Sequence, residues 1–192
     1  MNKLLTLITI LLFSNNVSSQ SNEEGYFVGY ETLEMIMNNF QNFAGEVGYR
    51  YDDKNQVRLS IIEVNLTERH LSSDWEAYAV DGPDVEGYLR GYELNYDRFF
   101  YKGWYISANV GYYNDYYRHT KLDMELENKT LTVGSGIGFI TSNLFGVDHL
   151  YLNFSNPVRF YFNSIDETKM GETTIRPHVI VNNMWLLIGY KF

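Results

Sequence analysis

Hydrophobic and polar residues alternate at every second position along most of the chain. In the last segment, Met184, Leu186, Ile188, Tyr190 and Phe192 share one face, and the opposite face is mixed. This is the period of a β-strand, and it continues to the final residue, where chains commonly fray. The pattern therefore predicts a last strand that is paired at both of its edges.

Seven earlier segments show the same alternation and are bounded by polar or glycine-containing turns. The eight segments cover residues 24–33, 43–51, 57–61, 88–96, 104–113, 131–139, 150–162 and 184–192. Each has one face rich in aromatic and aliphatic side chains, which suit a pleated sheet. We therefore predict an all-β chain of eight strands.

The connections between these segments alternate in length. Short ones are expected at Asp52–Asn55, near Asp97–Gly103 and at Thr141–His149, and longer ones at Thr67–Glu86, Asn114–Lys129 and Asn163–Thr173. The first connection, near Met37–Asn42, is short for its class. Short turns on one side, long loops on the other and an even strand number are the plan of a transmembrane β-barrel. We predict an eight-stranded antiparallel up-and-down transmembrane β-barrel.

The second face of the segments carries charges of both signs. They are Glu31, Glu46, Glu93, Arg50, Arg58, Arg159 and Lys191. Eight strands enclose a lumen that side chains just fill, and the many Tyr, Phe, Trp and Leu side chains would overfill it. We therefore expect the apolar face to meet lipid and the charges to pair inside, where Gly134, Gly136 and Gly138 leave room. A secreted soluble barrel with an apolar ligand would have the opposite arrangement.

Aromatic residues gather where the predicted strands end. Tyr112, Tyr113, Tyr116 and Tyr117 precede a long loop, and Tyr96, Phe99, Phe100, Trp104 and Tyr105 surround a short turn. Rings with a polar end collect at both membrane interfaces. We expect two aromatic girdles, and the alternative is a sugar-stacking patch on a soluble protein.

Composition narrows the class of protein. The chain of 192 residues has 17 Tyr, 12 Phe, no Cys and a net charge of −9. A single domain fits this length. Without Cys there is neither a disulfide framework nor a thiolate metal site, and the acidic balance argues against nucleic acid as a partner.

The first residues differ from the rest. One lysine precedes an apolar run from Leu4 to Phe13, and Val17 and Ser19 are placed as a small-residue cleavage signal. The run is too short to span a bilayer as a helix, so we predict a signal peptide at residues 1–19 and a barrel domain at 20–192. An N-terminal membrane anchor is the alternative. An exported chain without Cys suits a bacterial envelope.

The chain's ending resembles the C-terminal strand of bacterial outer-membrane barrels, which finish on Phe after alternating aromatic or apolar residues. In length, strand number and ending, the mature chain resembles small eight-stranded barrels of the OmpA/OmpX type, in a form common in Bacteroidota. The resemblance implies a Gram-negative outer membrane, contact with its lipid and lipopolysaccharide, and recognition of the strand ending in Phe192 by the barrel-assembly machinery. We expect a monomer that acts through its surface loops in envelope integrity, adhesion or surface interaction.

We predict no catalytic, cofactor-binding or metal site, and no open channel. The enzymatic alternative is a lipid-modifying hydrolase that uses a loop histidine, His70 or His119; His70 has Ser72, Ser73 and Asp74 nearby. His149 and His178 lie near a short turn and at the start of the last strand. We expect the acidic loop Thr67–Glu86 to be solvated, because its spacing matches no calcium loop; the alternative is that it binds a divalent cation, such as one bridging lipopolysaccharide phosphates.

Overall fold

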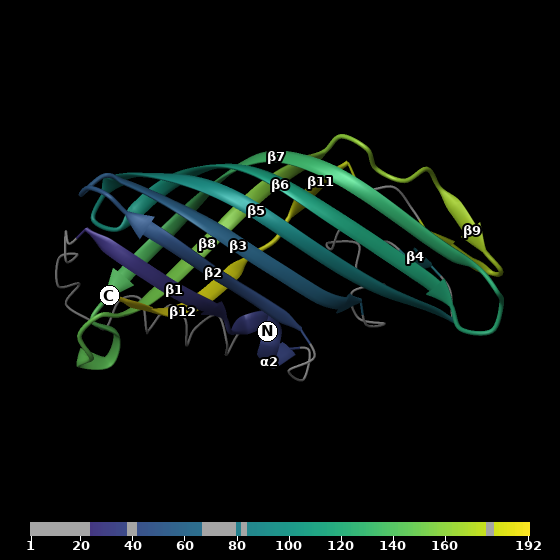
Figure 1. Cartoon of the computed structure of the whole chain (residues 1–192), viewed down its shortest axis with the longest axis horizontal. Helices are drawn as coiled ribbons and strands as arrows, with labels where there is room; N and C mark the ends of the chain where they lie inside the picture. Colours follow the sequence, from purple (N-terminus) through teal and green to yellow (C-terminus); the bar gives the residue numbers. More distant parts are fainter. Residues whose placement is uncertain (1–23, 38–41, 67–79, 82–83, 176–178) are drawn as a thin grey trace.

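Eight antiparallel strands close into one barrel (Figure 1). This computed structural model describes residues 24–37, 42–66, 80–81, 84–175 and 179–192. The wall consists, in order, of β1 (Gly25–Glu31), β2 (Phe43–Arg50), β3 (Asn55–Leu66), β5 (Val85–Tyr101), β6 (Trp104–His119), β7 (Glu125–Ser142), β8 (Leu150–Tyr161) and β12 (Trp185–Lys191). β12 pairs with both β8 and β1. The all-β class, the strand number and the double pairing of the last strand are confirmed.

The remaining elements are short. They are α2 (Leu33–Met37), η1 (Leu144–Gly146), β4 (Val80–Asp81), β9 (Thr168–Met170), β10 (Thr173–Ile175) and β11 (Ile180–Asn182). β11 pairs with β8 ahead of β12 and so begins the eighth wall strand. β4, β10 and β9 form a separate small sheet. Among the described residues, no helix has the length and apolar character needed to cross a membrane.

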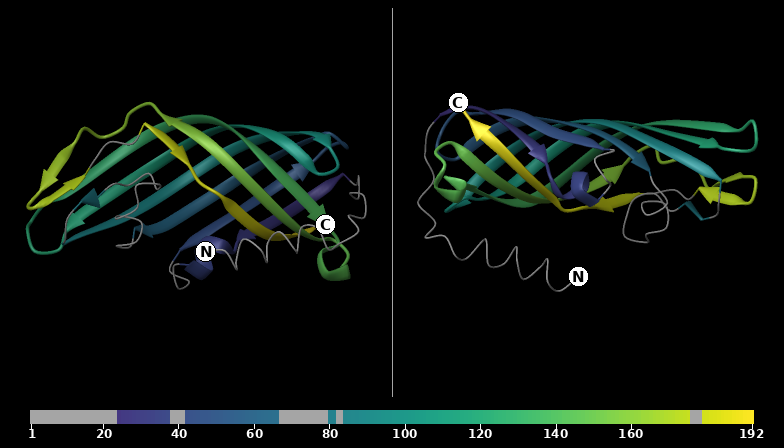
Figure 2. Two further views of the ribbon diagram at one scale, coloured as in Figure 1. Left: turned by 180° about the vertical axis from the view of Figure 1, so that it is seen from behind. Right: turned by 90° about the horizontal axis from the view of Figure 1, so that it is seen from below.

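The two ends of the barrel differ, as the alternating connections predict (Figure 2). The terminal end carries the C-terminus, η1 and the tight turns that join β2 to β3 and β5 to β6. The loop end carries α2 and the β9–β10 hairpin.

One predicted loop is wrong: Asn114–Lys129 is mostly strand, because β6 continues to His119 and β7 begins at Glu125. Likewise β5 continues to Tyr101. Residues 1–23, 38–41, 67–79, 82–83 and 176–178 lie outside the described residues. They include the predicted signal peptide and most of the predicted connections Met37–Asn42 and Thr67–Glu86.

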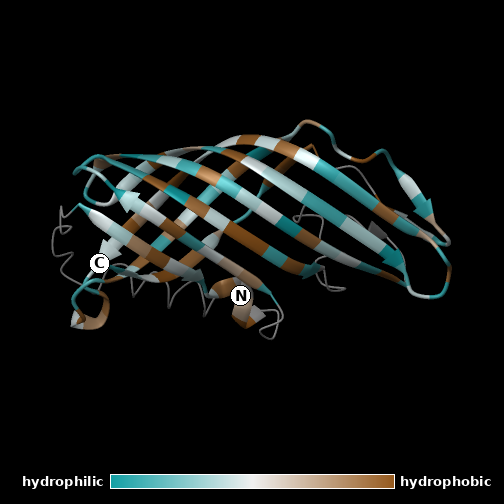
Figure 3. Ribbon diagram, in the orientation of Figure 1, coloured by the Kyte–Doolittle hydropathy of each residue, from teal (hydrophilic) through white to brown (hydrophobic). Residues whose placement is uncertain are grey.

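The apolar face points outward and the charged face points inward. Val110 is 56% exposed and Ile137 is 46% exposed, whereas Glu46 and Arg50 are 3% and 2% exposed. Figure 3 shows hydrophobic and hydrophilic residues alternating along the strands of the wall. A soluble barrel with an apolar lumen would show the reverse, so this arrangement is the one a lipid-facing barrel needs.

The orientation of the apolar residues reverses towards the loop end of β5, β6 and β7. Tyr112 points outward and is 43% exposed, but Tyr113 points inward and is 2% exposed. Beyond this point the outward residues of β6 are Asn114, Tyr116 and Arg118. The strands therefore continue past the apolar band as an extension with a polar outer face and an apolar inner face.

Candidate functional site

The lower lumen, towards the terminal end, contains a buried ion-pair network. Arg58 donates from Nη1 to Glu46 at 2.9 Å and from Nε to Asp97 at 2.8 Å, and Gln56 Nε2 donates to the same Asp97 oxygen at 2.8 Å. The side chains of both acids are 0% exposed. Alternation brings these residues from β2, β3 and β5 onto one inner face. One buried guanidinium therefore pairs with two buried carboxylates, and neutral donors such as Gln56 stabilise the remaining negative charge.

Neutral side chains complete the environment of Glu46. The Tyr151 hydroxyl donates to Glu46 Oε1 at 3.0 Å, and Asn153 Nδ2 donates to the same oxygen at 3.1 Å. Tyr105 donates in turn to Asn153 Oδ1 at 2.8 Å. This network joins strands on opposite sides of the barrel and fills the lumen at this level.

A second ion pair lies nearer the loop end. Arg159 on β8 forms a bidentate pair with Glu93 on β5, and the Tyr113 hydroxyl donates to Glu93 at 3.0 Å. Arg159 also donates to Asn183 Oδ1 at 2.6 Å and lies over the Trp185 ring, 5.2 Å from its centre. The predicted pairing of interior charges is confirmed for Arg58 and Arg159.

Inward aromatic rings lie over glycines of the neighbouring strand. A Cβ on Gly138 would be 2.1 Å from Cζ of Tyr105, and a Cβ on Gly91 would be 2.3 Å from Cε1 of Tyr113. No side chain fits at either place without moving the ring. The predicted crowding at Gly138 is confirmed, but the predicted girdles are correct only in part, because Phe99, Tyr105, Tyr113 and Tyr117 point inward and are buried.

The loop end is closed by an apolar core that the sequence pattern did not reveal. Met170 on β9 and Ile175 on β10, each 1% exposed, pack in one cluster with Tyr117 of β6, Leu89 of β5 and Trp185 of β12. The small hairpin therefore covers the inner face of the extension. We call this unit, formed by the extended ends of β5–β7 with β9 and β10, the cap.

His119 joins two turns of the cap. Its Nδ1 accepts hydrogen bonds from the backbone N–H groups of Lys121 at 3.1 Å and Leu122 at 3.2 Å. A Cβ on Gly171, in the β9–β10 turn, would be 2.7 Å from its Nε2. Within the described residues, the hydrogen bonds of this ring join backbone amides and no hydroxyl nucleophile, so its geometry is that of a structural histidine.

A row of polar side chains marks the outer border of the apolar band. Glu63, Arg90, Asn114 and Lys129 lie side by side on β3, β5, β6 and β7. Arg90 donates to Glu63 at 2.6 Å, and Asn114 donates to Glu127 at 3.0 Å. The Arg90 and Lys129 side chains are 53% and 59% exposed. The next row of outward residues towards the terminal end contains Ile61, Tyr92, Tyr112 and Leu131. The outer wall therefore changes from apolar to polar between two consecutive rows.

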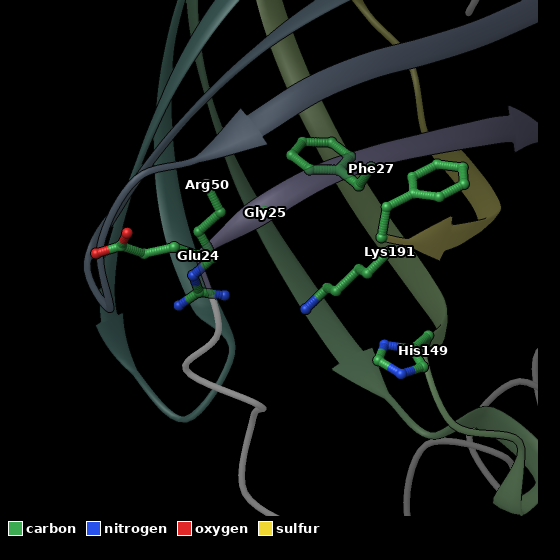
Figure 4. Close-up of a pocket in the computed structure, with 7 residues that line it drawn as sticks. Glu24, Gly25, Phe27, Arg50, His149 and Lys191 are labelled. Carbon is green, nitrogen blue, oxygen red and sulfur yellow. The ribbon is translucent and has the colours of Figure 1, made fainter.

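A small pocket opens at the terminal end (Figure 4). It is lined by Glu24, Gly25, Phe27, Arg50, His149, Lys191 and Phe192. Arg50 comes from the end of β2, Lys191 from the end of β12, and His149 from the turn before β8. Strand ends far apart in sequence thus bring three basic side chains to one opening, which no local sequence motif could indicate.

The other histidines and acids give no catalytic or metal arrangement that can be described. His70 and His178 lie outside the described residues, as do Ser72, Ser73 and Asp74. His149 is exposed and its ring lies beside that of Tyr190 in a tilted arrangement, with ring centres 5.8 Å apart. In the part of the chain that the structure describes, no group of three His, Asp or Glu side chains is placed to hold a metal ion.

The chain was compared with protein families, curated proteins and solved structures. No protein-family model matches the chain, and no curated protein matches it. Among solved structures, the N-terminal β-barrel domain of Pseudomonas aeruginosa OprF aligns over 89% of this chain and 98% of that domain, with 13% identity and a TM-score of 0.43. The eight-stranded architecture of small outer-membrane barrels, expected from the chain's ending and strand pattern, is established by the closed sheet itself.

Proposed function

We propose that this protein is a non-enzymatic, monomeric barrel of a bacterial outer membrane, which acts at the cell surface through its cap and loops. The observation that carries the proposal is the inverted distribution of side chains. Val110 and Ile137 are exposed on the wall while Glu46, Arg58 and Asp97 are enclosed. In hydrocarbon every backbone polar group needs a partner, and the double pairing of β12 meets that need at the chain's last strand.

The border row suggests how the wall meets the outer leaflet. Arg90 and Lys129 are exposed basic groups at the edge of the apolar band. Arginine and lysine bind phosphate groups well, so these two residues would contact lipopolysaccharide phosphates if the loop end faces outward. The termini would then lie in the periplasm.

The C-terminal strand is suited to recognition by the barrel-assembly machinery before the barrel closes. Phe192 is 73% exposed and the outward face of β12 presents Ile188 and Tyr190 beside it. In the folded barrel both edges of β12 are occupied. The assembly machinery would therefore read this strand while at least one edge is still free.

The cap is the part best built for contact with external partners. Its sheet stands beyond the apolar band on strands that are continuous with the wall, and its outer face is polar. The buried core under it holds the hairpin in one position. A surface that is rigid and exposed in this way suits adhesion or envelope contacts better than transport, because the lumen below it is filled.

Single cysteines test both membrane insertion and orientation. The chain has no Cys, so Thr120→Cys in the β6–β7 turn and Asp148→Cys at the terminal end each provide one exposed thiol. We expect a membrane-impermeant maleimide to label Thr120→Cys in intact cells and Asp148→Cys only after the outer membrane is opened. Gel mobility should also change when the sample is boiled, because membrane barrels remain folded in cold SDS.

Two results would contradict the proposal. Recovery of the native chain in the soluble fraction with unchanged gel mobility would remove the membrane assignment. Labelling of Asp148→Cys in intact cells, with Thr120→Cys protected, would reverse the orientation and place the cap in the periplasm.

A further inference from the structure

Two tyrosines lie side by side on the outer face of the cap, directly beyond the border row. Tyr88 on β5 pairs with Tyr116 on β6, where the two strands run together towards the loop end (Figure 1). Both side chains face outward, because the neighbouring residues Leu89 and Tyr117 point inward and are buried in the cap. Two aromatic rings are thus presented together on the outer wall, above the apolar band.

A hydrogen bond from each hydroxyl to a carboxylate on the next strand fixes the two rings. Tyr88 donates to Glu63 on β3, and Tyr116 donates to Glu125 on β7. A ring whose hydroxyl reaches a neighbouring strand leans over the sheet, so one of its faces packs on the sheet and the other remains open. The partial burial of both side chains agrees with this geometry. Because the rings lean in opposite directions, they form a broad aromatic surface, which we call the tyrosine platform (Tyr88 and Tyr116).

Polar groups of both signs surround the tyrosine platform. Arg118 lies between Glu86 and Glu125 in the row beyond it, and Glu127 lies beside Tyr116 with its side chain 51% exposed. On the described parts of β5, β6 and β7 beyond the border row, no outward residue is aliphatic. A neutral polyhydroxyl compound such as a sugar needs aromatic faces for its C–H groups and both donors and acceptors for its hydroxyls. The platform and its edges offer these groups together.

The position of the tyrosine platform indicates where such a sugar would come from. The apolar band ends with Tyr112 and Leu131, the border row follows, and the platform is the next outward row. Successive outward residues on a strand are about 7 Å apart. A lipid whose acyl chains lie against the apolar band therefore has its phosphates near the border row, and the groups attached to its head lie at the platform. In lipopolysaccharide those groups are sugars.

We infer that the tyrosine platform binds the core sugars of lipopolysaccharide in the surrounding leaflet, with sugar rings packed on the open faces of Tyr88 and Tyr116. Arg118 and Glu127 exchange hydrogen bonds with the sugar hydroxyls at the edges. This inference rests on the proposed function, because these sugars meet the platform only if the loop end faces outward. It adds to the proposed phosphate contacts a site that distinguishes one glycolipid from another by its sugars.

Two lipopolysaccharides that differ only in their sugars test the inference. Both have the same lipid A with its phosphates; one is truncated after its innermost sugars, and the other has a complete core without phosphate substituents. The folded full barrel in phosphatidylcholine nanodiscs receives increasing mole fractions of each, and NMR follows the rings of Tyr88 and Tyr116 and the backbone amide of Arg118. The complete core should bind about tenfold more tightly, because acyl chains and lipid A phosphates are common to both.

Tyr88→Leu and Tyr116→Leu should each weaken binding of the complete core by about two- to tenfold and leave binding of the truncated form unchanged. Tyr112→Leu is the matched control, because Tyr112 is an outward tyrosine of the same strand as Tyr116 but lies in the apolar band. This variant should retain the wild-type preference for the complete core. Each variant is first shown to be folded by its heat-dependent gel mobility, and Tyr88→Leu is decisive if Tyr116→Leu does not fold.

Equal affinity of the wild type for the two lipopolysaccharides would overturn the inference, as would loss of the preference in Tyr112→Leu. Either result leaves the proposed function intact, provided that cysteine labelling places Thr120 outside the cell and Asp148 inside. Nanodiscs offer lipopolysaccharide to both leaflets, so the titration does not depend on the orientation in cells. Reversed labelling would overturn the proposed function, and with it the assignment of the natural ligand, even where the titration shows that the two rings bind sugar.

Discussion

Arg58 and Asp97 face each other inside the barrel, with Arg58 Nε 2.8 Å from Asp97 Oδ2 and neither side chain more than 4% exposed. Arg58 also forms an ion pair with Glu46, so one guanidinium pairs with two carboxylates, one on β2 and one on β5. Removal of Arg58 would leave two negative charges enclosed together. Removal of one partner of a buried pair is much more costly than replacement of the whole group.

Arg58→Met should therefore lower the free energy of unfolding by about 3–5 kcal/mol. Urea-induced unfolding in detergent or lipid vesicles measures the effect. The triple variant Arg58→Met, Glu46→Gln, Asp97→Asn should recover part of the loss, because no charge is then left without a partner. If Arg58→Met is no less stable than Lys102→Met, which changes an exposed lysine, the network does not contribute to stability.

The contact between Gly138 and Tyr105 gives a second prediction. Gly138→Ala places a methyl group where the Tyr105 ring lies, and overpacking of this kind costs about 1–3 kcal/mol. Pairing Gly138→Ala with Tyr105→Leu should be less damaging than the sum of the two single changes, by about 0.5–3 kcal/mol in a double-mutant cycle. Ser135→Ala, at an outward position of the same strand, is the control and should be close to neutral. Strict additivity would show that the ring moves aside freely.

Strand alternation was sufficient to predict the wall and its two faces. The outward apolar side of β12, the inward charges Glu46 and Arg159, and the crowded glycines of β7 all follow from a period of two and the volume of an eight-stranded lumen. These features depend on residues a fixed distance apart in one strand. A single sequence shows such spacing directly.

The cap could not be predicted in the same way, because there the apolar side chains of the strands point inward and the polar ones point outward. Below the border, Tyr112 faces outward to the apolar band; above it, Tyr113 and Tyr117 face a protein core while Arg118 faces outward. The alternation therefore changes phase along one continuous strand. In the sequence, this change of phase looks the same as a strand that ends and is followed by a polar loop. For that reason the sequence pattern predicts a loop at Asn114–Lys129. The contacts of Met170 and Ile175 with β6 depend on long-range folding and leave no local signal.

A buried carboxyl in the cap predicts a pH dependence. Asp115 lies on the inner face of β6, above the border row and so outside the proposed membrane span. Burial raises the pKa of Asp115 to about 7, and a hydrogen bond from Asn128 offsets part of that effect. An unfolded aspartate titrates near pH 4 (about 3.9). The folded state thus holds the proton more tightly than the unfolded state does.

The contribution of Asp115 to stability is consequently greatest below about pH 4 and is lost as the pH rises through about 7. Asp115→Asn, which cannot ionise, lacks this dependence. We expect the stability of the wild type relative to Asp115→Asn to fall between these two pH values and to level off above them, measured by the urea midpoint across the range. A constant difference between the two proteins would show that the Asp115 carboxyl is not shielded as the structure indicates.

The border row gives the last prediction, since it sets where a charge on the outer wall becomes costly. Val110 lies within the apolar band on β6, and Tyr116 lies beyond the border on the same face of the same strand. An arginine near the middle of a bilayer costs about 2–4 kcal/mol on a barrel wall, and near the interface about 0–1 kcal/mol. Val110→Arg should therefore lower the free energy of unfolding in lipid vesicles strongly, whereas Tyr116→Arg should have little effect, because its new charge meets water and the neighbouring Glu125 and Glu127. In short-chain detergent micelles, which adapt to a charged side chain more easily, the gap between the two variants should narrow. Equal costs at the two positions in vesicles would mean that the apolar band does not end at Glu63, Arg90, Asn114 and Lys129.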